Sequence, residues 1–163
     1  MGRNLEDALK GALLLEQRGK ALYENAAQST EKPAVAELFR TLAGEEERHI
    51  QMLEGFFREY REKGRTGEPG VTPEEIAGSI LTDEVKQEVT EASYEAAVIY
   101  AAMGLEEKAI SYYADQAEKA ADEHARDLFK KLADWERTHL ELLMAIDEDL
   151  RQRVWNDQHF WPF

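Results

Sequence analysis

The chain has 163 residues, a formal net charge of −14 and no cysteine. This length suits one domain with a sizeable core, while the acidic balance disfavours binding to nucleic acid or anionic membranes and the missing thiols exclude disulfides and cysteine-based metal sites. The sequence shows neither an apolar signal core nor a stretch of about 18 apolar residues that could span a membrane, so we expect a cytoplasmic protein.

The first half of the chain predicts two helices joined by a short loop. Apolar and small residues recur at steps of three and four through residues 5–26, which indicates a first helix with Asn4 as its N-cap. Pro33 suits the first turn of a second helix, and Gly64 suits its C-terminal stop. The two helices are expected to form an antiparallel hairpin.

Residues 64–82 are rich in glycine and proline and predict a linker. Within this linker, residues 72–75 indicate a short capped helical turn. Helical character returns from about Asp83, with a break near residues 90–93. The whole segment 64–92 is therefore expected to be a long crossover between two hairpins.

A third long helix is predicted through residues 99–117, and a loop near Asp122 leads to a fourth. His124 falls at the start of this helix, away from its apolar stripe, and is expected at the surface. The C-terminal residues 148–163 are expected to form an aromatic tail, which includes His159. Within this tail the helical period is lost from Arg153 onward. So apolar a tail should pack on its own bundle, on a dimer mate or on a partner.

An internal repeat of 90 residues is the most informative feature of the sequence. Seven residues between 35 and 53 are identical to residues between 125 and 143, with no gap. The repeats, about 4–62 and 94–147, predict an all-α four-helix bundle over residues 1–147, built from two repeated hairpins with a pseudo-twofold axis. The identical residues of the first copy are Leu38, Phe39, Leu42, Ala43, Glu46, His49 and Leu53.

Two Glu-x-x-His motifs lie on the apolar stripes of the second and fourth helices. Glutamate is abundant in this chain, so the motif alone is weak. The stripes of the first and third helices each carry one more glutamate, at the same distance from the hairpin loop as the motif. Glu45 and Glu47 fall off the stripe and are expected in solvent. The six residues expected to meet at mid-bundle are Glu16, Glu46, His49, Glu106, Glu136 and His139.

Buried carboxylates are costly without a partner or a metal ion. Four carboxylates and two neutral imidazoles would balance the charge of two divalent cations in a dry core. Mixed oxygen and nitrogen ligation suits iron or manganese, and zinc also fits this ligand type. The sequence therefore predicts a site for two metal ions, with iron as the expected metal.

One glutamate on each of two helices, with Glu-x-x-His on each of the other two, is the pattern of ferritin-like di-iron proteins. The run Phe39-x-x-Leu-Ala-x-x-Glu46-x-x-His49, and Tyr23 seven residues after Glu16, resemble rubrerythrins most closely, over about residues 4–147. The resemblance implies that the six residues are iron ligands. It also implies that Tyr23 and Tyr113 donate hydrogen bonds to ligand carboxylates, with core packing as the alternative role.

The sequence departs from peroxide-reducing rubrerythrins in two respects. Those proteins carry a rubredoxin-like domain with four cysteines that supplies electrons, whereas this chain has no cysteine and would need an external donor. They also place an extra glutamate one turn after the ligand of the third helix, where this chain has Ala109. A ligand exchange that uses such a carboxylate is not expected here.

The leading functional hypothesis is a di-iron oxidoreductase that reduces peroxide or O₂ in oxidative-stress defence. One alternative is a ferroxidase and iron-storage protein of the bacterioferritin type, and another is a non-catalytic metal-binding or interaction bundle. A homodimer or larger homo-oligomer is expected, with the aromatic tail as a candidate for the interface. Trp135, next to Glu136, is interpreted as a packing residue rather than a redox relay.

Overall fold

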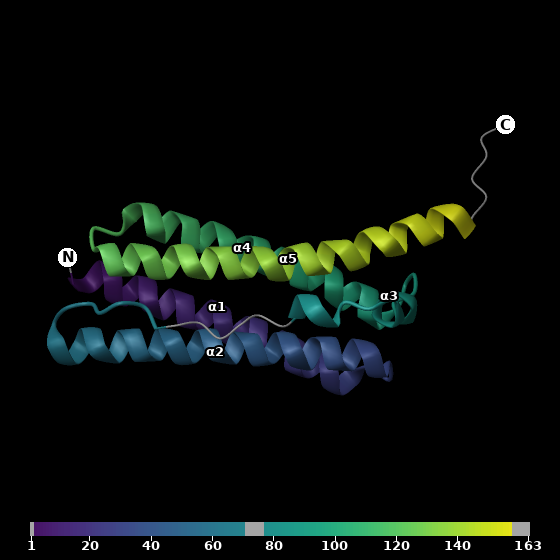
Figure 1. Cartoon of the computed structure of the whole chain (residues 1–163), viewed down its shortest axis with the longest axis horizontal. Coiled ribbons are helices and arrows are strands. Elements are labelled where there is room, and N and C mark those ends of the chain that lie inside the picture. The colour runs from purple at the N-terminus through teal and green to yellow at the C-terminus, as the bar shows by residue number, and fades with distance from the viewer. Residues whose placement is uncertain (1, 71–76, 158–163) are drawn as a thin grey trace.

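The computed structural model describes residues 2–70 and 77–157, and in these ranges the chain is helical with no strand. The first hairpin consists of α1 (Gly2–Ser29) and α2 (Pro33–Lys63), and the second of α4 (Tyr94–Lys119) and α5 (Glu123–Asp157). Figure 1 shows the four long helices side by side, with each hairpin antiparallel. The predicted all-α bundle is thereby confirmed. No helix in the described ranges has the length and apolar character needed to cross a membrane.

Local chemistry accounts for the helix ends of the first hairpin. Pro33 begins α2, and Gly64 ends it with a positive φ of 65°, a conformation that glycine adopts without steric cost. Asn4 lies inside α1, so the prediction that it caps this helix is wrong. Helical geometry already extends to Gly2, two residues before the apolar stripe begins.

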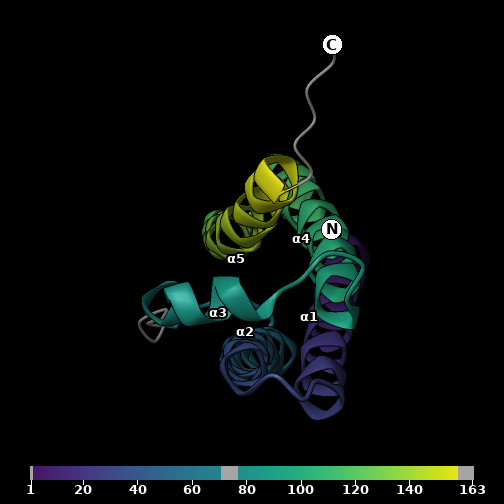
Figure 2. The same cartoon turned by 90° about the vertical axis from the view of Figure 1, so that its right-hand side faces the viewer.

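The crossover between the hairpins contains a 3₁₀ turn, η1 (Ala77–Ile80), and a short helix, α3 (Asp83–Glu88). Both pack against α2 and α5, and Figure 2 shows α3 between these two helices. Glu88 of α3 accepts hydrogen bonds from the N–H groups of Ala34 and Val35 at 2.9 and 3.0 Å, and so caps the N-terminus of α2. The predicted turn at residues 72–75 lies outside the described residues.

Helix α5 is longer than the sequence pattern predicts. Its helical geometry continues to Asp157, so the expected loss of helix from Arg153 is wrong for residues 153–157. Arg153 Nη2 donates to the carbonyl oxygens of Lys86 and Val89 at 2.6 and 2.8 Å, which ties this extension to α3. Trp155 is 69% exposed on the same extension. His159 and the rest of the aromatic tail lie outside the described residues, so docking of the tail stays a prediction.

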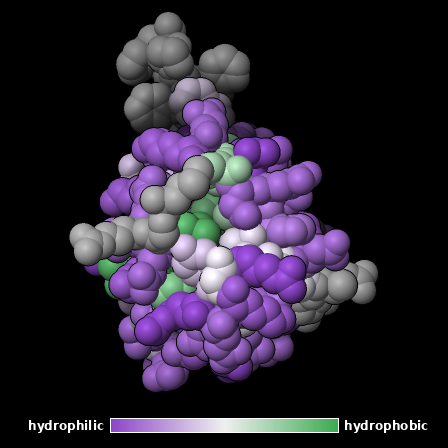
Figure 3. All heavy atoms as spheres, turned by 90° about the vertical axis from the view of Figure 1, so that its left-hand side faces the viewer, coloured by the Kyte–Doolittle hydropathy of each residue, from purple (hydrophilic) through white to green (hydrophobic). Residues whose placement is uncertain are grey.

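Two apolar clusters fill the bundle on either side of its middle. One contains Tyr23, Phe39 and Ile146, and the other contains Leu9, Tyr113 and Phe129. Figure 3 looks onto the end where α2 ends and α5 begins, where hydrophilic residues dominate around a small apolar hollow. The bundle is therefore apolar toward both ends of its core and polar outside, and residues at mid-length sit between two dry regions.

Candidate metal centre

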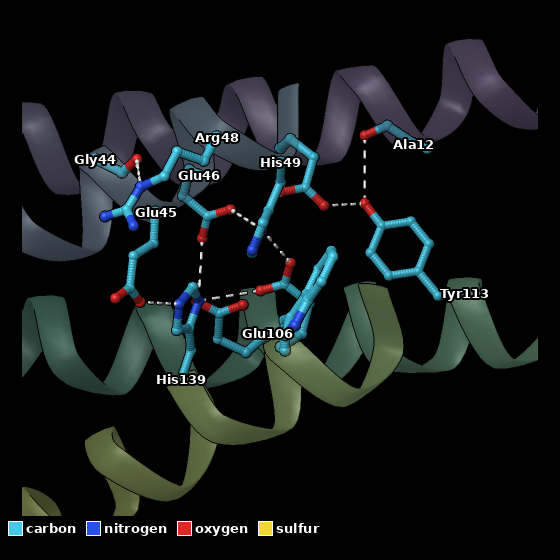
Figure 4. A network of polar contacts seen from close by, with 12 residues as sticks. Ala12, Gly44, Glu45, Glu46, Arg48, His49, Glu106, Tyr113 and His139 are labelled. Carbon is cyan, nitrogen blue, oxygen red and sulfur yellow. Dashed lines mark hydrogen bonds and ion pairs between the residues drawn. The ribbon is translucent and has the colours of Figure 1, made fainter. Parts of the chain in front are cut away.

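A cluster of six buried polar side chains lies at mid-length, between the two apolar clusters (Figure 4). The helices α1 and α4 contribute one glutamate each, and α2 and α5 contribute a glutamate and a histidine each. None of the six residues is more than 3% exposed. The structure thus brings together every residue predicted as a ligand: Glu16, Glu46, His49, Glu106, Glu136 and His139.

Two of the glutamates, Glu46 and Glu136, lie between the two imidazoles. His49 Nδ1 lies 3.4 Å from Glu46 Oε2 and 3.3 Å from Glu136 Oε1. His139 Nδ1 lies 3.4 Å from Glu46 Oε1 and 3.2 Å from Glu136 Oε2. Each of these glutamates therefore presents one oxygen to each histidine, as carboxylates that bridge two metal ions do.

The other two glutamates each belong to one histidine. Glu16 Oε2 lies 3.1 Å from His49 Nδ1, and Glu106 Oε1 lies 3.7 Å from His139 Nδ1. The result is two overlapping groups of four residues, each with potential ligand atoms within 4.8 Å of one another. The shared members of both groups are Glu46 and Glu136.

Tyr23 and Tyr113 connect the two hairpins through their hydroxyl groups. Tyr23 on α1 donates to Glu106 on α4, and Tyr113 on α4 donates to Glu16 on α1. Burial, followed by the negative charge of the contacted glutamate, raises the pKa of both phenols well above the ordinary value. Both tyrosines therefore remain protonated donors that orient the unshared carboxylates. Their contribution to metal binding stays a prediction.

Sequence reasoning missed Glu45. It was expected in solvent, but it is 2% exposed, and its Oε2 lies 2.8 Å from Nε2 of His139 (Figure 4). The prediction failed because the apolar stripe of α2 identifies only one buried face, whereas the position next to Glu46 is also covered, by α5. The 90-residue repeat could have indicated that Glu45 is buried, because it aligns Glu45 with the large aromatic residue Trp135. Glu47, by contrast, is partly exposed, which agrees with its expected place in solvent, and it forms an ion pair with Lys20.

Trp135 and His124 are both half-buried. The ring of Trp135 stacks on His49 with a centroid distance of 4.8 Å and an interplanar angle of 12°. Trp135 thus packs directly against a candidate ligand. His124 lies at the start of α5 and is not among the clustered residues.

The charges of the cluster are strongly coupled. Burial opposes ionisation of Glu16, but hydrogen bonds from His49 and Glu46 outweigh it and lower the pKa of Glu16 to about 2. Burial and the negative charge of Glu16 raise the pKa of Glu46 to about 7. The same two causes raise the pKa of Glu136 well above the ordinary value. Without a cation, protons therefore occupy part of this site at neutral pH.

The two histidines follow the same logic. Burial disfavours their charged forms, but the surrounding carboxylates raise the pKa of both imidazoles well above the ordinary value. Among these carboxylates, Glu136 contributes most to the raised pKa of His49, and Glu106 contributes most to that of His139. A cluster rich in carboxylates thus attracts positive charge, whether from protons or from metal ions.

Comparison with protein-family models identifies the family to which this helical bundle belongs. The rubrerythrin family model matches residues 7–147, which include most of the four long helices and the whole cluster. The chain belongs to the rubrerythrin family. Searches of curated proteins and of solved structures gave no match. Rubrerythrins typically bind iron, and the buried cluster of this member fits a di-iron site.

Buried polar atoms that lack a hydrogen-bond partner show whether the residues of this rubrerythrin fit a pair of metal ions. Among the described residues, the buried side-chain atoms without a hydrogen-bond partner are both carboxylate oxygens of Glu136 and Nδ1 of His139. Buried polar atoms are normally satisfied. All three atoms point into the cluster, where they lie at ion-pair distances from its other members. Two cations between the histidines would satisfy all three, so the residues fit.

The metal-free protein should lose stability as the pH rises from about 5 to about 7.5. In this window Glu46 and Glu136 hold protons in the folded state that an unfolded carboxyl releases, because their folded-state pKa values are raised. Folding therefore takes up protons, and the free energy of unfolding falls as protons become scarce. Urea denaturation of chelator-treated protein at both pH values measures this change.

The variant Glu46→Gln tests whether the pH dependence of stability arises from the buried cluster or from the overall charge of the protein. The amide imitates the protonated carboxyl, so the variant should show a shallower fall of stability with pH than the wild type. A metal-free wild-type protein that becomes more stable across this window would contradict the assignment of raised pKa values.

Proposed function

We propose that the protein is a di-iron oxidoreductase that reduces peroxide or O₂ with electrons from an external donor. The observation that carries the proposal is the pair of overlapping ligand groups that share Glu46 and Glu136 in a buried core. Two ferrous ions bound there would supply the two electrons that, with two protons, convert hydrogen peroxide to two molecules of water.

The protein's own residues have distinct tasks in this scheme. Glu46 and Glu136 would be ligands shared by both ions, because each presents one oxygen to each histidine. The tyrosine hydroxyls hold the unshared glutamates, which limits their rotation as the charge of the site changes. The near-complete burial of the cluster keeps bulk water out and confines the reaction to small oxidants.

Iron oxidation linked to storage is a second candidate function. It is favoured by Ala109, which is buried one turn after the ligand Glu106 and provides no extra carboxylate. Without that carboxylate, the six-residue set resembles the ligand set of bacterioferritins, whose cages store iron, as closely as that of rubrerythrins. The two candidates differ in assembly, because storage requires a large cage and uptake of many irons per chain.

Anaerobic loading with Fe²⁺, removal of unbound iron and addition of hydrogen peroxide test the proposal. We expect about two irons per chain, oxidised with a stoichiometry of one peroxide per iron pair. A loaded protein that stays ferrous in peroxide would contradict peroxide reduction. Elution as a large cage in size-exclusion chromatography, with uptake far beyond two irons, would favour storage.

A further inference from the structure

The two halves of the metal centre differ next to the histidines. The 90-residue repeat places Glu45 of α2 in register with Trp135 of α5, immediately before the two shared glutamates. The ligands themselves are identical in both copies, so this pair is a departure from symmetry at the edge of the site. Each of the two residues contacts the histidine of the opposite hairpin.

Glu45 acts on His139. Its Oε2 lies 2.8 Å from Nε2, and the side chains are 2% and 1% exposed. An ionised carboxylate can only accept, so Nε2 of His139 donates to Glu45, and Nδ1 is the ring nitrogen that faces the cluster and could bind a metal ion. In Figure 4 the ring of His139 lies between Glu45 on one side and Glu106 on the other. Such a carboxylate fixes the ring and makes the imidazole a stronger ligand.

Trp135 acts on His49 in a different way. The indole lies nearly parallel to the imidazole, with an interplanar angle of 12°. Stacking holds the orientation of the ring, but an indole offers no negative charge and no acceptor to the imidazole. The His49 half of the site therefore lacks the charge that Glu45 adds to the His139 half.

We propose that Glu45 makes the two metal positions unequal, so that a divalent cation fills the His139 position first and binds it more tightly than the His49 position. The first position is formed by Glu46, Glu106, Glu136 and His139, and the second by Glu16, Glu46, Glu136 and His49. This inference rests on the proposed metal site and is independent of the reaction with peroxide. Glu45 is a positioning residue, because it acts on the metal through His139.

The test uses Zn²⁺, which has no redox chemistry, and full-length protein with ¹⁵N-labelled histidine. The imidazole signals are assigned with single variants of the four histidines and followed by NMR as Zn²⁺ is added to chelator-treated protein. At one equivalent the His139 signals should move to their bound positions while those of His49 remain largely unshifted. Calorimetry should show two affinities. Equal filling, or earlier filling at His49, would overturn the proposal.

Glu45→Gln should lower the affinity of the first position by about 10- to 100-fold, the usual effect of removing such a partner, and should abolish the order of filling. Glu47→Gln is the matched control. It removes the same charge two residues away, from a partly exposed side chain that pairs with Lys20 and not with the cluster. Equal effects of the two variants would show a general charge effect and would overturn the role of Glu45.

Trp135→Glu provides a second, independent variant. It places the carboxylate of the repeat beside His49 and should raise the affinity of the second position toward that of the first. Circular dichroism checks that each variant is folded. If neither the wild type nor any variant binds Zn²⁺, the metal site itself fails, whereas two equal sites in the wild type refute only the inequality.

Discussion

Simultaneous replacement of Glu46 and His49 by alanine should abolish binding of the metal pair. Glu46 belongs to both ligand groups and His49 supplies the only imidazole of one of them, so each position loses at least one of its four ligand residues. Metal analysis after iron loading and desalting should give about two irons per chain for the wild type and close to none for the variant.

A matched pair on the same helix controls for the loss of side chains. Glu47 and Gln51 of α2 form a hydrogen bond of 3.0 Å on the exposed face. Glu47→Ala with Gln51→Ala should therefore leave iron uptake unchanged. Uptake of nearly two irons by the Glu46, His49 double variant would show that iron binds elsewhere and would refute the site.

Removal of metal should lower the thermal stability of the wild type strongly. The cluster packs several carboxylates against one another, and metal bound to the folded state alone adds stability that grows with its free concentration. At 1,000 times the dissociation constant this contribution is about 4 kcal/mol. In a chain of this size each kcal/mol moves the melting temperature by roughly 2–4 °C, so a shift on the order of 10 °C is expected.

Thermal melts with excess Fe²⁺ or Zn²⁺ and with a chelator measure this shift. The double variant of Glu46 and His49 is the control, since its melting temperature should not respond to metal. Identical melting temperatures of the wild type with and without metal would mean that the cluster is a protonated polar core, the non-catalytic alternative. A shift of the same size in both proteins would place the metal outside the cluster.

The repeat made most of the fold and the cluster predictable from sequence. Helical periodicity places a residue on a face, and a gapless 90-residue repeat places two faces in equivalent positions. Glu16 and Glu46 could be set at the same height because they lie equally far from the hairpin loop. These relations are local or symmetric, so they do not depend on details of side-chain packing.

Helical periodicity cannot predict contacts that a residue makes outside the apolar stripe of its own helix. Glu45 lies one residue from the stripe, and its burial depends on α5 and on the partner His139. The helical extension at residues 153–157 is held by hydrogen bonds from Arg153 to Lys86 and Val89, which lie 67 and 64 residues earlier in the chain. Both the burial of Glu45 and the extension of α5 involve long-range polar contacts. The sequence pattern within a single helix does not indicate such contacts.

Anomalous diffraction from crystals of the iron-loaded protein tests the central claim most directly. Data collected at the iron edge should show two peaks in the core, one beside His49 and one beside His139, with Glu46 and Glu136 between them. A core without anomalous density, with iron only at the acidic surface, would contradict the assignment of a di-iron centre.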